Sequence, residues 1–114
     1  DQEELFLRDM FCASNGDVLE AYAGGADPRD PRLSPIYGDF TDCPPTFIQA
    51  GSIESLAAGA LRMVDKLVRS GCEVHFTFGK GMPHTFAMDY ALYPEAENAM
   101  NEILAFINNV LDLK

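Results

Sequence analysis

The sequence predicts an α/β fold with parallel strands joined by a crossover helix. Two short strand patterns, 46–50 and 73–78, are each followed by a stretch with helical periodicity. A connection of this length suits a right-handed crossover between parallel strands. Because two strands alone leave unpaired edges, we expect the sheet to be incomplete within these 114 residues.

The length and charge of the chain limit its class. With 114 residues, it can form one small domain around one core. Its net charge of -10 argues against nucleic acid and anionic membranes as partners, because neither attracts an acidic surface. No apolar run is long enough to span a bilayer, and the acidic first residues do not resemble a signal peptide.

The three cysteines, Cys12, Cys43 and Cys72, are widely spaced and show no CxxC pair. Their odd number and spacing argue against a disulfide framework and against a zinc site. We therefore expect reduced thiols in a cytoplasmic protein.

Residues 1–45 are predicted to be a helical and loop lead-in to a strand-helix-strand-helix unit over 46–114, the whole forming a single segment. Short helices are predicted at Glu3–Cys12 and Asp17–Tyr22. Residues 26–45 hold five of the seven prolines, which predicts a packed connection rather than a helix or central strand.

The segment Thr46–Ala50 reads as a buried strand between Pro45 and Gly51. Ser52 is predicted to cap a long helix over Ile53–Ser70. That helix carries an apolar stripe typical of a core-facing surface, formed by Leu56, Ala60, Met63, Val64 and Leu67.

The second strand, Glu73–Phe78, alternates between apolar and polar side chains. His75 falls on its more polar face, where we expect a structural role. A last helix is predicted from Tyr93 and Pro94 onward, since proline suits the first turn. Its predicted apolar side consists of Ala96, Met100, Ile103, Leu104, Ile107 and Leu111.

The glycine-rich loop after the second strand carries His84 directly after Pro83. Open α/β sheets place their chemistry at the carboxyl ends of strands, and histidine is the commonest general acid or base. Glu54 follows the first strand at the same edge. Because adjacent strands lie about 5 Å apart, this carboxylate and imidazole can meet.

Three motifs carry a resemblance to a known family. They are Asp-Pro-Arg-Leu-Ser-Pro at 30–35, Pro-Pro-Thr at 44–46 leading to Gly-Ser at 51–52, and Gly-Met-Pro-His-Thr-Phe at 81–86. From about Ala21 onward, the chain resembles the C-terminal portion of an α/β-hydrolase fold, in the hormone-sensitive-lipase-like branch of bacterial carboxylesterases. An acid followed by a histidine is also the chain order of the triad in that superfamily.

The resemblance implies that His84 is the histidine and Glu54 the acid of a Ser-Glu-His triad in a short-chain carboxylic ester hydrolase, which needs no metal or organic cofactor. Met82 and Phe86 are weaker candidates for the substrate pocket, with packing as the alternative. None of the serines lies in a Gly-x-Ser-x-Gly elbow. We therefore expect the nucleophile and the oxyanion hole to lie outside this chain, and the chain alone to be inactive.

Two other readings remain open. The chain can be an inactive hydrolase segment that binds a partner through an open sheet edge, either the N-terminal half of the fold or a second copy. Particle size distinguishes such pairing from a monomer. A peptidase of the same fold is weaker, because the loop containing His84 fits the esterase branch better.

Overall fold

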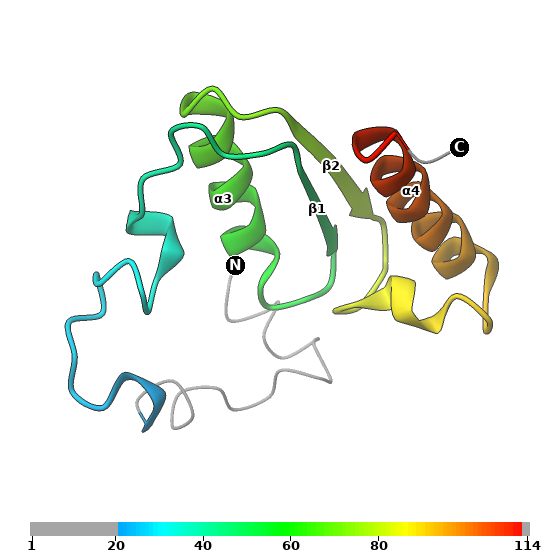
Figure 1. Cartoon of the computed structure of the whole chain (residues 1–114). Coiled ribbons are helices and arrows are strands. Elements are labelled where there is room, and N and C mark those ends of the chain that lie inside the picture. Colours follow the sequence, from blue (N-terminus) through cyan, green and yellow to red (C-terminus); the bar gives the residue numbers. More distant parts are fainter. Residues whose placement is uncertain (1–20, 113–114) are drawn as a thin grey trace.

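The computed structural model describes residues 21–112 (Figure 1). The predicted helix at 3–12 and the first residues of the helix at 17–22 lie outside this range. Residues 21–23 are helical, and Gly24 and Gly25 follow with φ angles of 56° and 80°. Within the described range, no helix combines the length and apolarity needed to cross a membrane.

The proline-rich connection is built from turns and one short 3-10 helix, η1 (Pro35–Tyr37). Arg32 forms an ion pair with Asp30, with 2.6 Å between the guanidinium and carboxylate atoms. The hydrogen bond from the Arg32 side chain lowers the pKa of Asp30. The segment thus agrees with the predicted ordered connection, although its 3-10 turn was not expected.

Two parallel strands, β1 (Thr46–Gly51) and β2 (Val74–Gly79), form the sheet of the described region. Their register pairs the first residue of each strand and ends with Gly51 opposite Gly79. The crossover between them is α3 (Ala57–Arg69), as predicted from the sequence.

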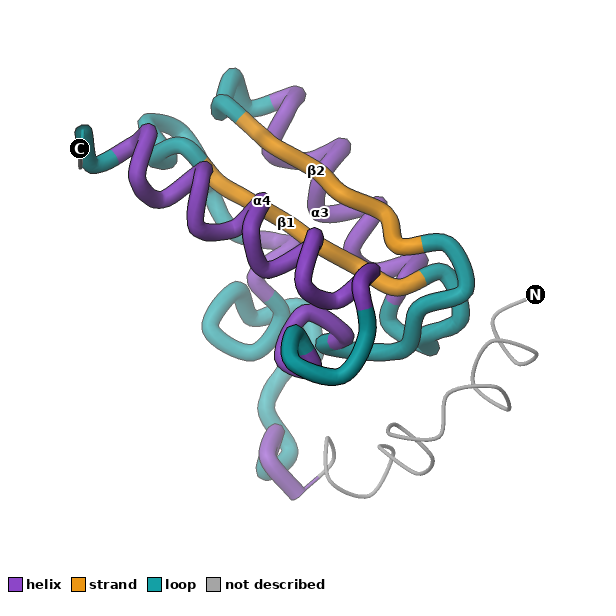
Figure 2. Tube along the Cα trace, turned by 90° about the vertical axis from the view of Figure 1, so that its right-hand side faces the viewer, coloured by secondary structure: helices purple, strands orange, loops and turns teal. Residues whose placement is uncertain are grey.

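The helices α3 and α4 (Pro94–Val110) cover opposite faces of this pair. In Figure 2, α4 lies in front of the strands and α3 behind them. The ring of Phe106 on α4 lies 5.4 Å from that of Phe47 and 5.0 Å from that of His75, measured between centroids. These contacts agree with a packing role for His75, whose Nε2 also lies 3.2 Å from the Glu73 carboxylate.

The start of α3 differs from the prediction. The helix begins at Ala57 rather than Ile53, because residues 52–56 form turns and a bend, in which the Glu54 carbonyl accepts a hydrogen bond from the Ala57 N–H at 3.3 Å. Ser52 is therefore not the cap, and its side chain bonds to the loop carrying His84 instead. Leu56, expected in the buried stripe, is 47% exposed just before the helix.

The predicted apolar side of α4 is only partly buried. Ala96 and Ala99 are buried, and Ala99 packs with Phe86 and Ala87 of the short helix η2 (Phe86–Asp89), whereas several predicted core residues are exposed. The exposed members are Leu104, Ile107 and Leu111. The helical spacing of apolar residues assigned both flanks of α4 to the core. In the structure, the flank that carries Phe106 is the one that faces the two strands.

Candidate active site

Two connections meet at the carboxyl ends of the strands. The turn after Gly51 carries Glu54, and the loop after Gly79 carries His84. Gly51 and Gly79 are partners in the strand register, so the two connections leave the sheet side by side. This is the edge at which the sequence predicted the two side chains to meet.

Hydrogen bonds join the two connections directly. The Ser52 N–H donates to the Gly79 carbonyl at 2.8 Å, and the Ile53 N–H donates to the Met82 carbonyl at 3.3 Å. In the opposite direction, the Gly81 N–H donates to Ser52 Oγ at 2.7 Å. The backbone of one connection thereby positions the backbone of the other.

Gly51 and Gly79 allow this close approach because they lack side chains. A Cβ atom on Gly51 would collide with the backbone of Met82 and Pro83. A Cβ atom on Gly79 would lie 2.6 Å from the ring of Phe86, closer than real Cβ atoms come to their neighbours. Space rather than an unusual φ angle therefore requires glycine at both strand ends.

We expect Gly51→Ala to destabilise the protein by about 3 kcal/mol, because the new methyl group meets backbone atoms that cannot rotate away. Gly59→Ala in α3 is the matched control, since no atom lies within 4 Å of its added Cβ. A helical glycine replaced in this way should gain up to about 1 kcal/mol. Urea unfolding of both variants measures the difference, and similar midpoints would contradict this account of the strand end.

The Glu54 side chain is buried, with the residue only 4% exposed. Its Oε2 accepts a hydrogen bond from the Gly51 N–H at 3.0 Å and lies 3.5 Å from Nδ1 of His84. A buried carboxylate needs such partners, because removing its charge from water is costly. Its place just before the N-terminus of α3 also favours a negative charge.

The His84 side chain is 36% exposed and turns Nδ1 toward Glu54. An acid beside Nδ1 favours the tautomer that carries its proton there, which leaves Nε2 free on the opposite side of the ring. Such an imidazole can accept a proton from a hydroxyl group and later return it. The chain turns sharply just after it, with Thr85 at a φ angle of 54°.

The loop rests on an apolar core. Phe86 is 3% exposed and packs with Ala87 and Ala99, and Met82 packs partly buried against them. The structure thus places the two pocket candidates, Met82 and Phe86, in contact with the core beneath the loop. Because this core includes α4, the helix supports the histidine loop from inside.

The side chain of Tyr93 forms a hydrogen bond with the backbone just after the loop that carries His84. Its hydroxyl donates a hydrogen bond to the Phe86 carbonyl at 3.4 Å. Burial, followed by the negative charges of Asp89 and Glu95, raises the pKa of Tyr93, so the hydroxyl stays protonated as a donor. The sequence carries no signal for this role, because a tyrosine at a helix start does not reveal which carbonyl its hydroxyl will reach.

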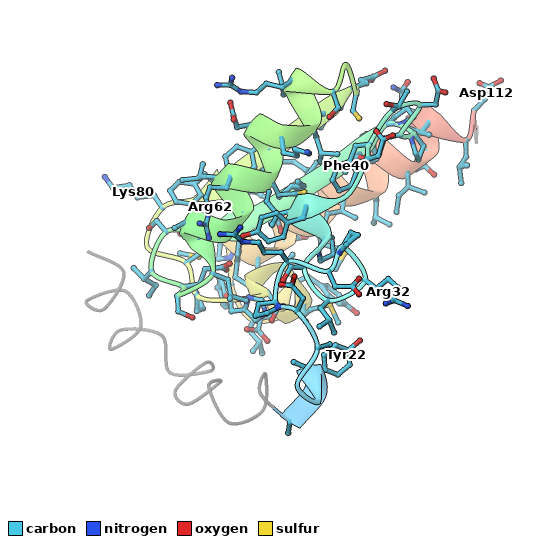
Figure 3. The ribbon with its side chains drawn as sticks, turned by 90° about the vertical axis from the view of Figure 1, so that its left-hand side faces the viewer. Tyr22, Arg32, Phe40, Arg62, Lys80 and Asp112 are labelled. Atoms are coloured by element: carbon cyan, nitrogen blue, oxygen red, sulfur yellow. The ribbon has the colours of Figure 1, made fainter. Side chains whose placement is uncertain are left out.

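The loop between β2 and η2 also carries the cationic side chain of Lys80. Lys80 extends outward from the ribbon in Figure 3, away from the core of the molecule. Among residues 21–112, no group of three or more His, Cys, Asp or Glu side chains gathers as a metal site would require. What the structure places together at this edge is an imidazole beside a buried carboxylate, a pair that is able to transfer a proton.

Comparisons with known proteins show which family and which proteins this chain is similar to. A family profile described as "alpha/beta hydrolase fold" matches residues 4–88. An esterase of Acinetobacter venetianus is 40% identical over 86 residues, which are 75% of this chain and 28% of that protein. An acetyl-hydrolase of Streptomyces hygroscopicus is 35% identical over 90 residues, covering 79% of this chain and 30% of that protein.

Solved structures show the same similarity. A hormone-sensitive lipase from a metagenome library superposes with a TM-score of 0.87 and 29% identity, over 93% of this chain and 37% of that one. A second hormone-sensitive-lipase homologue from a metagenome library gives 0.88 and 28%, over 95% and 38% of the two chains. The chain thus spans less than two fifths of the length of these relatives.

Proposed function

This chain belongs to the alpha/beta hydrolase fold family, and on that basis we propose that it supplies the histidine and the acid of a serine carboxylesterase. The observation that carries the proposal is the buried carboxylate of Glu54, 3.5 Å from Nδ1 of His84. The names of the relatives, an esterase and an acetyl-hydrolase, support a carboxylic ester with a small acyl group as substrate.

In the proposed mechanism, Nε2 of His84 removes the proton from a serine hydroxyl while the serine oxygen attacks the ester carbonyl. Glu54 holds the ring through Nδ1 and stabilises the imidazolium that forms. The protonated Nε2 then gives its proton to the departing alcohol as the ester bond breaks. Water, activated by His84 in the same way, attacks the acyl-enzyme and releases the carboxylic acid.

The nucleophile in this proposal comes from sequence outside these 114 residues. Two described serines already use their hydroxyls. Ser52 Oγ accepts the Gly81 N–H, and Ser70 Oγ donates to the Lys66 carbonyl at 2.9 Å. No serine of the sequence stands in a Gly-x-Ser-x-Gly elbow, the motif that exposes the nucleophile in this superfamily.

We therefore expect the purified chain to hydrolyse p-nitrophenyl acetate no faster than its His84→Ala variant. Without an activated serine, the covalent step has no attacking oxygen, and residual binding groups alone supply little catalysis. Initial rates at neutral pH, corrected for spontaneous hydrolysis, measure this. Activity of the chain that disappears in His84→Ala would instead show that one of its own serines or cysteines is the nucleophile.

The positive test is a chimera in which this chain replaces the matching segment of the Acinetobacter venetianus esterase. We expect the chimera to hydrolyse p-nitrophenyl acetate, because the relative then supplies the rest of the fold. Circular dichroism and a thermal melt establish that it folds. A folded but inactive chimera would contradict the proposal and favour a binding or oligomerisation module instead.

A further inference from the structure

Two cysteines lie at the end of the sheet opposite to His84. Cys43 precedes β1 and Cys72 precedes β2 in the sequence. Because the strands are parallel, both residues stand at the amino ends of neighbouring strands. Both are free thiols with partly buried side chains.

A shared hydrogen-bond acceptor brings the two residues together. Sγ of Cys72 donates to the Phe40 carbonyl at 3.2 Å, and the same carbonyl accepts the Cys43 N–H at 3.1 Å. On the other side, Sγ of Cys43 lies 3.5 Å from Oγ1 of Thr46. The Thr46 N–H in turn donates at 2.9 Å to the carbonyl of Glu73, the residue next to Cys72.

The two cysteines are neighbours at the Phe40 carbonyl, which contacts both the Cys72 sulfur and the Cys43 amide. Burial raises the pKa of the Cys72 thiol, and the nearby Cys43 thiol raises it further. Because the two residues are already neighbours, disulfide formation does not require distant segments to come together.

We propose that Cys43 and Cys72 are a redox modification site that closes to a disulfide when the protein meets a peroxide. The Cys43 thiolate attacks one peroxide oxygen, the O–O bond breaks, and sulfenic acid and water result. The Cys72 thiolate then attacks the Cys43 sulfur, the S–O bond breaks, and the oxygen leaves as a second water. Two thiols and one hydrogen peroxide thus give one disulfide and two waters, with two electrons passing from sulfur to oxygen.

The disulfide would link the residues before β1 and β2 across the crossover that contains α3. Such a link restricts the unfolded chain, and the two strands could no longer separate at their amino ends. Since Glu54 and His84 lie at the opposite ends of the strands, their geometry should not change. We expect the melting temperature of the oxidised protein to rise by about 10 °C, and dithiothreitol to reverse the rise. This inference does not depend on the proposed esterase function.

The test uses the full chain in a Cys12→Ser background, which leaves only Cys43 and Cys72 as thiols. After treatment with hydrogen peroxide, we expect both thiols to disappear from a thiol assay. Peptide mapping without reductant should recover the two cysteine peptides joined. The same treatment of Cys12→Ser with Cys43→Ser should give no intramolecular link and no reversible change in melting temperature.

Three results would overturn the proposal. They are two free thiols that persist after treatment, sulfinic acid at either cysteine without a linked peptide, or a link found only between two molecules. Peptide mapping of the Cys12→Ser protein alone distinguishes these outcomes. The test therefore does not require that the Cys43→Ser variant folds.

Discussion

Replacing His84 with alanine in the chimeric esterase is expected to lower kcat by roughly 10⁴- to 10⁶-fold and to leave KM nearly unchanged. The alanine removes the group that takes the serine proton and returns it to the leaving alcohol. It does not remove groups that bind the ester. Steady-state kinetics with p-nitrophenyl acetate separate the two parameters, and titration of the acyl-enzyme burst tests whether the first step is the one lost.

His75→Ala is the matched control, because His75 is the other histidine of the chain. It lies on β2, against Phe106 and beside Glu73. We expect it to change kcat by less than about threefold and to lower stability modestly through lost packing. If both variants lost the same amount of activity, impaired folding would explain the loss. That result would contradict a catalytic role for His84.

Replacing Glu54 with glutamine should lower kcat by about 10⁴-fold, the size found when a triad acid becomes its amide. Glutamine keeps the volume of the buried side chain, so the cavity that alanine would leave is avoided. Its amide oxygen can still accept the Gly51 N–H, but it cannot stabilise an imidazolium. Kinetics of the chimera, together with a thermal melt, measure the change in activity and stability separately.

Two further variants sharpen this test. Glu54→Asp keeps the negative charge but places it farther from His84, because the aspartate side chain is shorter. We expect its kcat to lie between those of Glu54→Gln and the parent enzyme. Glu73→Gln removes an exposed carboxylate that pairs with His75 and should leave kcat unchanged. A Glu54→Gln enzyme with kcat within about threefold of the parent would assign the triad acid to another residue.

Much of the fold could be predicted from glycine and proline positions. Pro45 directly precedes β1 and Gly51 is its last residue, and Pro94 is the first residue of α4, a position that suits proline. The parallel crossover followed from the strand-helix-strand order, because a connection of that length cannot be a hairpin. The incomplete sheet was also expected, since two strands cannot cover both helices.

The local bonds of the site could not be predicted in the same way. A serine after a strand is expected to cap the next helix, whereas Ser52 uses its oxygen for the loop that carries His84. Its partner, Gly81, lies 29 residues away in sequence, beyond what local propensity describes. Likewise, strand spacing brings Glu54 near His84, but the bond from Gly51 that fixes the carboxylate depends on the three-dimensional turn.

The two loops that meet at this edge are joined largely through backbone atoms. The amide of Ile53 and the carbonyl of Met82 bond to each other whatever side chains these residues carry. Mutational drift at these positions can therefore reshape the surroundings of the histidine and the acid without separating them. Gly51 and Gly79 differ from these positions, because any side chain there would displace the Met82 and Pro83 backbone or the Phe86 ring.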